Sequence, residues 1–185
     1  MALTKTPVCD FGKKAGDFKL KSINNELISL NDIKGEKATL IMFICNHCPY
    51  VKAIIKDLAK DCNELRNDGI NSVAIMSNDT KNYPEDSFDN MVNFAEINNF
   101  GEINYLFDET QEIAKKYGAV CTPDFFGYNE NLELQYRGRF RELKDLKPIN
   151  NGDSDLKIAM KMVAQTQKGP DEQIPSMGCN IKWFN

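Results

Sequence analysis

The feature that most constrains the fold is an unbroken, largely apolar run over residues 38–44, rich in residues that favour β-strands. Such a run is typical of a strand buried on both faces, as at the centre of a parallel sheet. Apolar residues then recur at three- and four-residue spacing over 51–65, which predicts a helix that ends at Asp68 and Gly69. A second apolar run over 70–77 predicts another strand. The order strand, helix, strand implies a right-handed parallel crossover.

The remaining segments predict a hairpin at each end of this unit. Alternating apolar and polar residues over 18–30, around Asn24 and Asn25, predict an N-terminal β-hairpin. We expect the other elements to be a helix from Pro84 with Phe88, Met91, Val92 and Ala95 on its inner face, a strand over 105–107, a helix from Asp108 to Gly118, strands over 124–128 and 132–137, and a helix capped at Asp153 or Ser154.

The sequence therefore predicts one α/β domain over residues 1–185, with a mixed central sheet flanked by helices and the N-terminal hairpin as an extension. The core of this domain is expected to span about residues 16–168. The C-terminal tail, residues 169–185, contains two prolines and no clear hydrophobic period, so we assign no element to it.

The charge balance excludes two classes of partner. The 23 Lys and Arg residues face 27 Asp and Glu residues, a net charge of −4, which provides no basic surface for nucleic acid or for a membrane. Arg137 and Arg139 alternate along a predicted strand, which is typical of a solvated face, with anion binding as the alternative. The first twenty residues lack the apolar stretch of a secretory signal, so we expect a cytoplasmic protein.

The motif that carries chemistry is Cys45-Asn46-His47-Cys48-Pro49, at the junction of the buried strand and the following helix. Unpaired N–H groups and the positive end of the dipole at a helix start stabilise a thiolate. Proline suits this position, because its missing N–H would have no partner there. In a reducing compartment, such a closely spaced pair indicates catalysis or metal binding rather than a structural disulfide. We therefore interpret it as a dithiol–disulfide switch.

Other uses of the pair are possible on the sequence alone. A zinc site needs further ligands, but no second closely spaced cysteine pair follows and His47 is the only histidine. Covalent haem attachment needs a histidine directly after the second cysteine, where Pro49 stands. Two inert core cysteines are a further alternative, and for His47 the alternative is a surface residue without a role.

Together with Thr122 and Pro123 before the second hairpin, this motif resembles the thioredoxin superfamily. The whole chain is similar to the bacterial thioredoxin-like redoxins of the AhpC/TSA (peroxiredoxin-like) type. The resemblance is carried by residues 45–51, 83–88, 107–111, 121–126, 136–139 and 176–183. It implies a thioredoxin-like fold, an exposed attacking thiol at Cys45, a buried resolving thiol at Cys48, and a cis proline at Pro123 facing both. The residues expected to modulate the pair are Asn46, His47, Pro49, Thr122 and Pro123.

The chain departs from both patterns. Ile44 stands where thioredoxins have tryptophan, and Asn46 and His47 replace their Gly-Pro. The peroxiredoxin pattern Pro-x-x-x-Thr-x-x-Cys would need proline at Ile41 and threonine at Cys45. Both are missing, which counts against peroxide reduction by that mechanism.

The other cysteines are expected to differ in role. Cys62 lies on the apolar face of the first long helix and is interpreted as packing, and Cys9 as incidental. Cys121, two residues before Pro123, is either a core residue or a third redox thiol. Cys179 is an accessible candidate for a second exchange or an intermolecular bond, with a packed tail residue as the alternative.

The favoured hypothesis is a thiol–disulfide oxidoreductase. Cys45 attacks a substrate disulfide, and Cys48 resolves the mixed disulfide. The first alternative is a thiol peroxidase, whose sulfenic acid would be resolved by Cys48, Cys121 or Cys179. A metal-binding carrier of thioredoxin-like fold is the second. We expect no cofactor and no bound metal, a disulfide-containing protein or small thiol as substrate, and a separate reductant.

Overall fold

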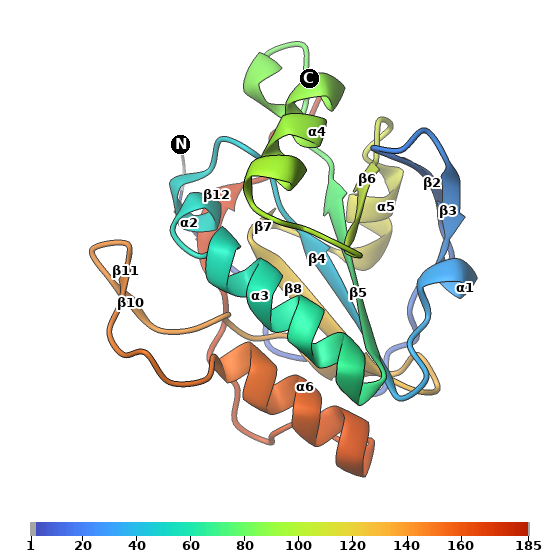
Figure 1. Cartoon of the computed structure of the whole chain (residues 1–185), viewed down its shortest axis with the longest axis vertical. Helices are drawn as coiled ribbons and strands as arrows, with labels where there is room; N and C mark the ends of the chain where they lie inside the picture. Colours follow the sequence, from blue (N-terminus) through green and yellow to red (C-terminus); the bar gives the residue numbers. More distant parts are fainter. Residues whose placement is uncertain (1–2, 185) are drawn as a thin grey trace.

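The computed structural model describes residues 3–184, and its centre is a seven-stranded mixed sheet. The strand order is β3-β2-β6-β5-β4-β8-β9, in which β4, β5 and β6 are parallel and the other neighbours antiparallel (Figure 1). Their bounds are β2 Lys19–Ser22, β3 Leu27–Ser29, β4 Ala38–Phe43, β5 Ile70–Met76, β6 Asn104–Phe107, β8 Asp124–Asn129 and β9 Leu134–Tyr136. The mixed sheet and its N-terminal hairpin confirm the prediction.

Helices cover both faces of this sheet. They are α1 Leu30–Ile33, α2 Pro49–Lys52, α3 Ile55–Leu65, α4 Phe88–Ile97, α5 Glu112–Tyr117 and α6 Asp155–Thr166. Side chains alternate along β4, so Leu40 and Met42 pack with α2, α3, α4 and α6, whereas Ile41 and Phe43 pack with α1 and α5. The central strand is therefore buried on both faces, as its apolar run predicts. None of the helices within residues 3–184 combines the length and hydropathy that crossing a bilayer requires.

A second, three-stranded sheet contains the tail that the sequence leaves unassigned. Its order is β1 (Leu3–Lys5), β12 (Met177–Asn180), β7 (Cys121–Thr122), with β12 antiparallel to both neighbours. A Cβ at Gly178 would collide with the carbonyl oxygen of Thr122, so a residue without a side chain is needed for this close approach. A short antiparallel hairpin, β10 (Leu143–Lys144) and β11 (Lys147–Pro148), forms a separate two-stranded sheet.

Two helix predictions are wrong in detail. The helix expected over 51–65 is interrupted at Ala53 and Ile54, which separate α2 from α3. No proline or glycine stands there, and Ile54 is buried in the core at the interruption. The helix expected from Pro84 begins instead at Phe88, after a 3₁₀ turn η2 (Pro84–Asp86).

The inner face of α4 and the start of α5 also differ from the prediction. Val92 is 38% exposed, and Phe94 packs against the core instead. Helix α5 begins only at Glu112, because Gln111 has a left-handed backbone (φ 64°). Asp108 still acts as a cap, since its carboxylate accepts the N–H groups of Ile113 and Ala114.

Arg137 is buried rather than solvated, which corrects the interpretation of its strand. Its guanidinium donates to both carboxylate oxygens of Asp124, at 3.3 and 3.0 Å, and to the Gly118 carbonyl at 2.8 Å. The guanidinium also lies 4.4 Å from the centre of the Phe126 ring. Arg139 is more exposed and pairs with Asp155 at 2.6 Å.

We expect Asp124→Ala to lower the free energy of unfolding by about 3–5 kcal/mol, because it leaves the buried guanidinium of Arg137 without its counter-charge. Urea unfolding monitored by circular dichroism measures this. The matched control is Glu102→Ala, which breaks the exposed pair with Arg66 and is expected to cost at most about 1 kcal/mol. Equal losses in both variants would contradict the structural role of the buried pair.

Candidate active site

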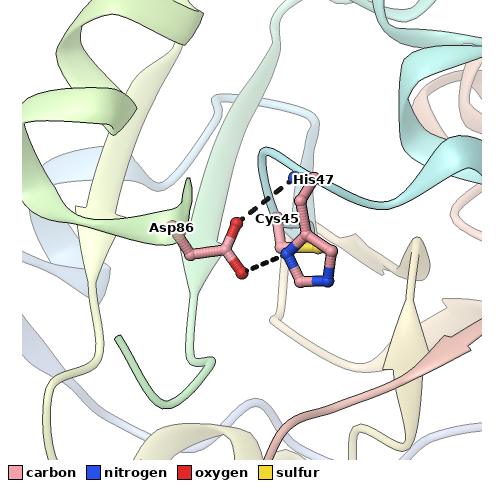
Figure 2. Close-up of side chains that lie close together, drawn as sticks. All are labelled: Cys45, His47 and Asp86. Carbon is pink, nitrogen blue, oxygen red and sulfur yellow. Dashed lines mark hydrogen bonds and ion pairs between the residues drawn. The ribbon is translucent and has the colours of Figure 1, made fainter. Parts of the chain in front are cut away.

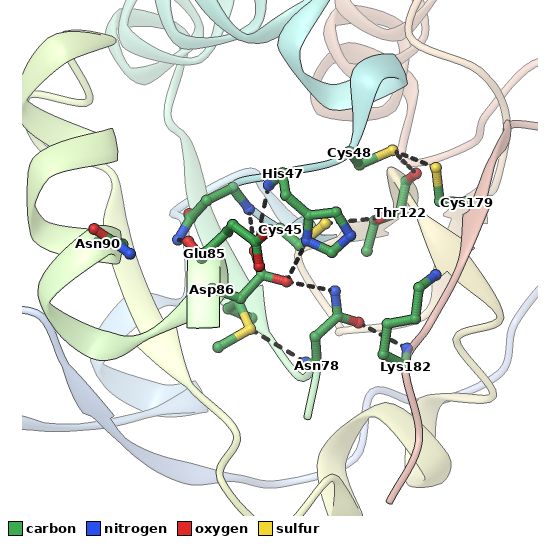
Figure 3. A network of polar contacts seen from close by, with 12 residues as sticks. Cys45, His47, Cys48, Asn78, Glu85, Asp86, Asn90, Thr122, Cys179 and Lys182 are labelled. Carbon is green, nitrogen blue, oxygen red and sulfur yellow. Dashed lines mark hydrogen bonds and ion pairs between the residues drawn. The ribbon is translucent and has the colours of Figure 1, made fainter. Parts of the chain in front are cut away.

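The CxxC motif lies at the edge of the sheet where parallel strands end. Cys45 follows β4 closely, and Cys48 is the N-cap of α2 with Pro49 in the first turn. Carboxyl ends of adjacent parallel strands meet at one edge, so the segment after β5 also reaches this site. The tail strand β12 closes it from the other side (Figure 3).

Both sulfurs of the motif contact Thr122. The Sγ of Cys45 is 3.2 Å from the Thr122 hydroxyl, and the thiol of Cys48 reaches the Thr122 carbonyl oxygen at 3.1 Å. The Thr122–Pro123 peptide bond is cis, as the resemblance predicts. The prediction of an exposed Cys45 is wrong, because both cysteines are 0% exposed. The side chain of His47 lies beside the Cys45 sulfur (Figure 2).

The two thiols differ in acidity, with Cys48 the more acidic. A hydrogen bond from the Cys45 thiol, supported by the Cys179 thiol and the Val51 backbone N–H, lowers the pKa of Cys48 to about 5. The same contact with Cys48 raises the pKa of Cys45, and burial and the nearby Asp86 carboxylate raise it further. These surroundings favour the charge on Cys48, whereas the sequence predicts the thiolate at Cys45. The helix-start amide contributes through Val51, as expected.

A buried carboxylate, Asp86, organises the loop between the two cysteines. One of its oxygens accepts the backbone N–H groups of Asn46 at 2.8 Å and His47 at 3.3 Å. The other is 2.7 Å from His47 Nδ1 and accepts the side-chain amide of Asn78 at 2.8 Å (Figures 2 and 3). The hydrogen bond with Asp86 raises the pKa of His47, although partial burial opposes the shift. The imidazole ring is also stacked on Tyr83, 5.5 Å away.

Further bonds tie this centre to the rest of the fold. The Asn46 side-chain oxygen accepts from the Tyr105 hydroxyl at 2.9 Å, and its amide donates to the Glu85 carbonyl at 3.1 Å. The Asn78 side-chain oxygen accepts the Lys182 backbone N–H at 2.9 Å, which connects the tail to the same network. The CxxC loop is therefore held from η2, β6 and the tail at once.

Sequence reasoning missed Asp86, Asn78 and Tyr105 as parts of the site. Asp86 falls within the helix expected from Pro84, but it lies in the 3₁₀ turn η2 and its side chain points back to the CxxC loop. One signal was available: polar residues after β5 belong to the same sheet edge as those after β4.

The structure separates the remaining cysteines. Cys179 is brought to Cys48, with their sulfurs 3.1 Å apart, and at 5% exposure it is not the accessible residue expected. Cys121 is buried, its thiol 3.5 Å from the Pro123 carbonyl oxygen, and burial raises its pKa. Cys62 packs in the core beside the sulfur of Met42, as predicted.

Three groups at the site have donor atoms suited to a metal. The Cys45 sulfur, a His47 ring nitrogen and an Asp86 oxygen all lie within 4.8 Å of one another. However, His47 Nδ1 and Asp86 are 2.7 Å apart, the spacing of a shared proton. Two nitrogen or oxygen ligands of a tetrahedral zinc ion lie about 3.3 Å apart, given bond lengths near 2.0 Å. Metal binding would therefore require this pair to separate.

Comparison with known proteins identifies the family. The model of the AhpC/TSA family matches residues 11–141. The chain belongs to the AhpC/TSA family. No curated protein matches it.

Solved structures place this AhpC/TSA protein among thioredoxin-like folds. An uncharacterised conserved protein from Geobacillus kaustophilus is 38% identical, with a TM-score of 0.94 over 100% of this chain and 97% of that chain. A hypothetical protein from Sinorhizobium meliloti 1021 is 36% identical, with a TM-score of 0.90 over 98% of each chain. The thioredoxin domain of a thiol-disulfide oxidoreductase from Bacteroides vulgatus shares the fold at 17% identity, with a TM-score of 0.58 over 69% of this chain and 86% of that chain.

We expect Asp86→Asn to lower the pKa of His47 towards its ordinary value of 6.5, because the main cause of the upward shift is removed. His47 is the only histidine, so its ring resonances in an NMR titration are unambiguous. A raised histidine pKa stabilises the fold fully below the unfolded value, and this contribution is lost as pH rises through the folded value. The wild type is therefore expected to gain stability as the pH falls and His47 is protonated. The Asp86→Asn variant is expected to gain less over the same pH range.

The matched control is Glu85→Gln, which removes the same charge from the exposed neighbouring residue. It is expected to leave most of the His47 shift in place. If both variants lower the pKa equally, general charge rather than the Asp86 hydrogen bond sets it.

Proposed function

We propose that this AhpC/TSA protein is a thiol–disulfide oxidoreductase in which Cys45 and Cys48 alternate between a dithiol and a disulfide. The observation that supports this most is the placement of both sulfurs on Thr122, 3.2 Å from its hydroxyl for Cys45 and 3.1 Å from its carbonyl oxygen for Cys48. A buried thiol pair at the end of a central strand, with one pKa lowered to about 5, is suited to exchange rather than to packing.

The reaction uses Cys45 as the sulfur that bonds to substrate. When a substrate disulfide is reduced, Cys45 loses its proton and attacks, a Cys45–substrate bond forms, and the other substrate sulfur leaves as a thiolate. The Cys48 thiolate then attacks the Cys45 sulfur, which forms the Cys45–Cys48 bond and releases the second substrate thiol. The imidazole of His47, oriented by Asp86 and beside Cys45, is the group to exchange the proton.

The acidity of Cys48 makes it the better leaving group of the two sulfurs. A sulfur of low pKa is a good leaving group, so a substrate thiolate that attacks Cys45 of the disulfide expels Cys48 readily. Each unit of lowered pKa also stabilises the reduced pair by about 1.4 kcal/mol, or roughly 30 mV.

The surroundings of the pair suggest how a protein substrate binds. A pocket of about 480 Å³ includes Pro123 and Tyr50 in its lining, which is largely apolar with four charged residues: Lys5, Arg139, Arg141 and Asp145. An extended peptide with an apolar side chain fits this lining. Because both sulfurs are buried, entry requires movement of a covering side chain, and His47 is the one beside Cys45.

We expect Cys48→Ser to accumulate a mixed disulfide on Cys45 when it is mixed with a disulfide-containing peptide, because the resolving sulfur is absent. Cys45→Ser is expected to accumulate none, and Cys9→Ser to behave as the wild type. Intact-protein mass spectrometry after alkylation measures each species. Equal trapping by wild type, Cys45→Ser and Cys48→Ser, with no Cys45–Cys48 bond in oxidised wild type, would refute the proposal.

The same variants distinguish the proposed oxidoreductase from a thiol peroxidase and from a metal carrier. Stoichiometric hydrogen peroxide that converts a cysteine to a sulfenic acid, trapped by a dione reagent, would favour the thiol peroxidase. About one equivalent of zinc or copper retained by the reduced protein, and lost in Cys45→Ser, would favour the metal carrier.

A further inference from the structure

Cys48 has a second sulfur neighbour besides Cys45. Its Sγ lies 3.1 Å from the Sγ of Cys179, about 1 Å longer than a disulfide bond of roughly 2.05 Å (Figure 3). The backbone N–H of Cys179 also contributes to the lowered pKa of Cys48. Cys48 is therefore the middle member of a row of three sulfurs.

Strand pairing and a side-chain hydrogen bond hold Cys179 next to Cys48. Strand β12 pairs with β7 so that Cys179 stands opposite Thr122, the residue that both motif sulfurs contact. Gly178 allows the close approach of these strands, since a Cβ there would collide with Thr122. Ser176 donates its hydroxyl to the Pro123 carbonyl at 2.8 Å, which fixes the strand from its other end. The tail is thus bonded around the site on both sides of Cys179.

We propose that Cys179 is a third redox thiol, which takes over the disulfide from the Cys45–Cys48 pair by exchange at Cys48. This inference rests on the proposed function, because it needs the Cys45–Cys48 disulfide as its starting point.

The exchange balances without an added oxidant. Cys179 loses its proton and attacks the Sγ of Cys48, so that the Cys48–Cys179 bond forms and the Cys45–Cys48 bond breaks. Cys45 leaves as a thiolate and takes up a proton. One disulfide and one thiol are present before and after, so no electrons enter or leave the protein.

This step separates the substrate from the reductant of the protein. Cys45 becomes free for another substrate, while the disulfide moves to Cys48 and Cys179, on the side of the tail strand β12. A dithiol reductant attacking from the side of the tail then meets Cys179 first. The row of sulfurs thus has a substrate end at Cys45 and a reductant end at Cys179.

The acidity of Cys179 sets the pH dependence. Burial, followed by the neighbouring Cys48, raises its pKa to about 12. Well below the pKa, each unit of pH raises the fraction of thiolate, and hence the rate of its attack, about tenfold. When Cys48 is in a disulfide it carries no charge, so one of the two main causes of the raised value is removed.

The test oxidises the full chain with glutathione disulfide and digests it with trypsin after thiol alkylation. Residues 38–52 and 169–182 are separate tryptic peptides, because Lys37, Lys52, Lys168 and Lys182 bound them. A Cys48–Cys179 bond therefore appears as a link between two peptides, whereas a Cys45–Cys48 bond stays within the first.

We expect wild type to give both species, with the linked peptides forming about tenfold faster per unit of pH above neutrality. Cys45→Ser is expected to give the linked peptides as its main oxidised product. Cys121→Ser is the matched control, since it removes the buried cysteine of the adjacent strand and is expected to keep the link. Circular dichroism checks that each variant is folded.

Two outcomes distinguish the proposals. If oxidised wild type contains the Cys45–Cys48 bond but folded Cys45→Ser carries only glutathione adducts, the role of Cys179 is refuted and the proposed function stands. If wild type forms neither bond, both are refuted. A link at a rate independent of pH would overturn attack by Cys179 as the mechanism.

Discussion

The site depends on one buried carboxylate. Asp86 is 0% exposed, and such a group is tolerated only where donors surround it. Two backbone N–H groups of the CxxC loop, the Asn78 amide and the His47 ring supply them. Because half of these donors belong to the loop backbone itself, the need to satisfy the carboxylate also determines how the loop runs between β4 and α2. The positions of Cys45 and Cys48 follow from it.

The chemistry of the thiols follows from their neighbours more than from the helix dipole. Helix α2 has only four residues, and it contributes one N–H, from Val51, to the Cys48 thiolate. The larger contribution comes from the thiol of Cys45, with further support from Cys179. Cys45 instead faces the carboxylate of Asp86, which disfavours its own charge. These neighbours therefore favour the charge on the second cysteine of the pair.

The sequence predicts what depends on local patterns. The apolar run of β4, the Gly69 stop, the hairpin of β8 and β9 and the Ser154 cap of α6 are readable because each rests on residues close together in the chain. Asp86, Tyr105 and Cys179 reach the site only through contacts of long range. The pairing of β12 with β7 joins residues 179 and 122, and no period within the tail indicates it. Local signals also overestimate the length of helices, as the interruption at Ile54 shows.

Three of these long-range contacts come from the C-terminal tail. It contributes a main-chain N–H at Lys182 to Asn78, a hydroxyl at Ser176 to the Pro123 carbonyl, and a sulfur at Cys179 to Cys48. Each of these groups bonds to a residue that belongs to the CxxC motif or contacts its sulfurs or the Asp86 carboxylate. A displacement of β12 would therefore disturb the acidity of Cys48 and the orientation of His47 together. The tail belongs to the candidate site as much as the motif does, although it lies more than a hundred residues away in the chain.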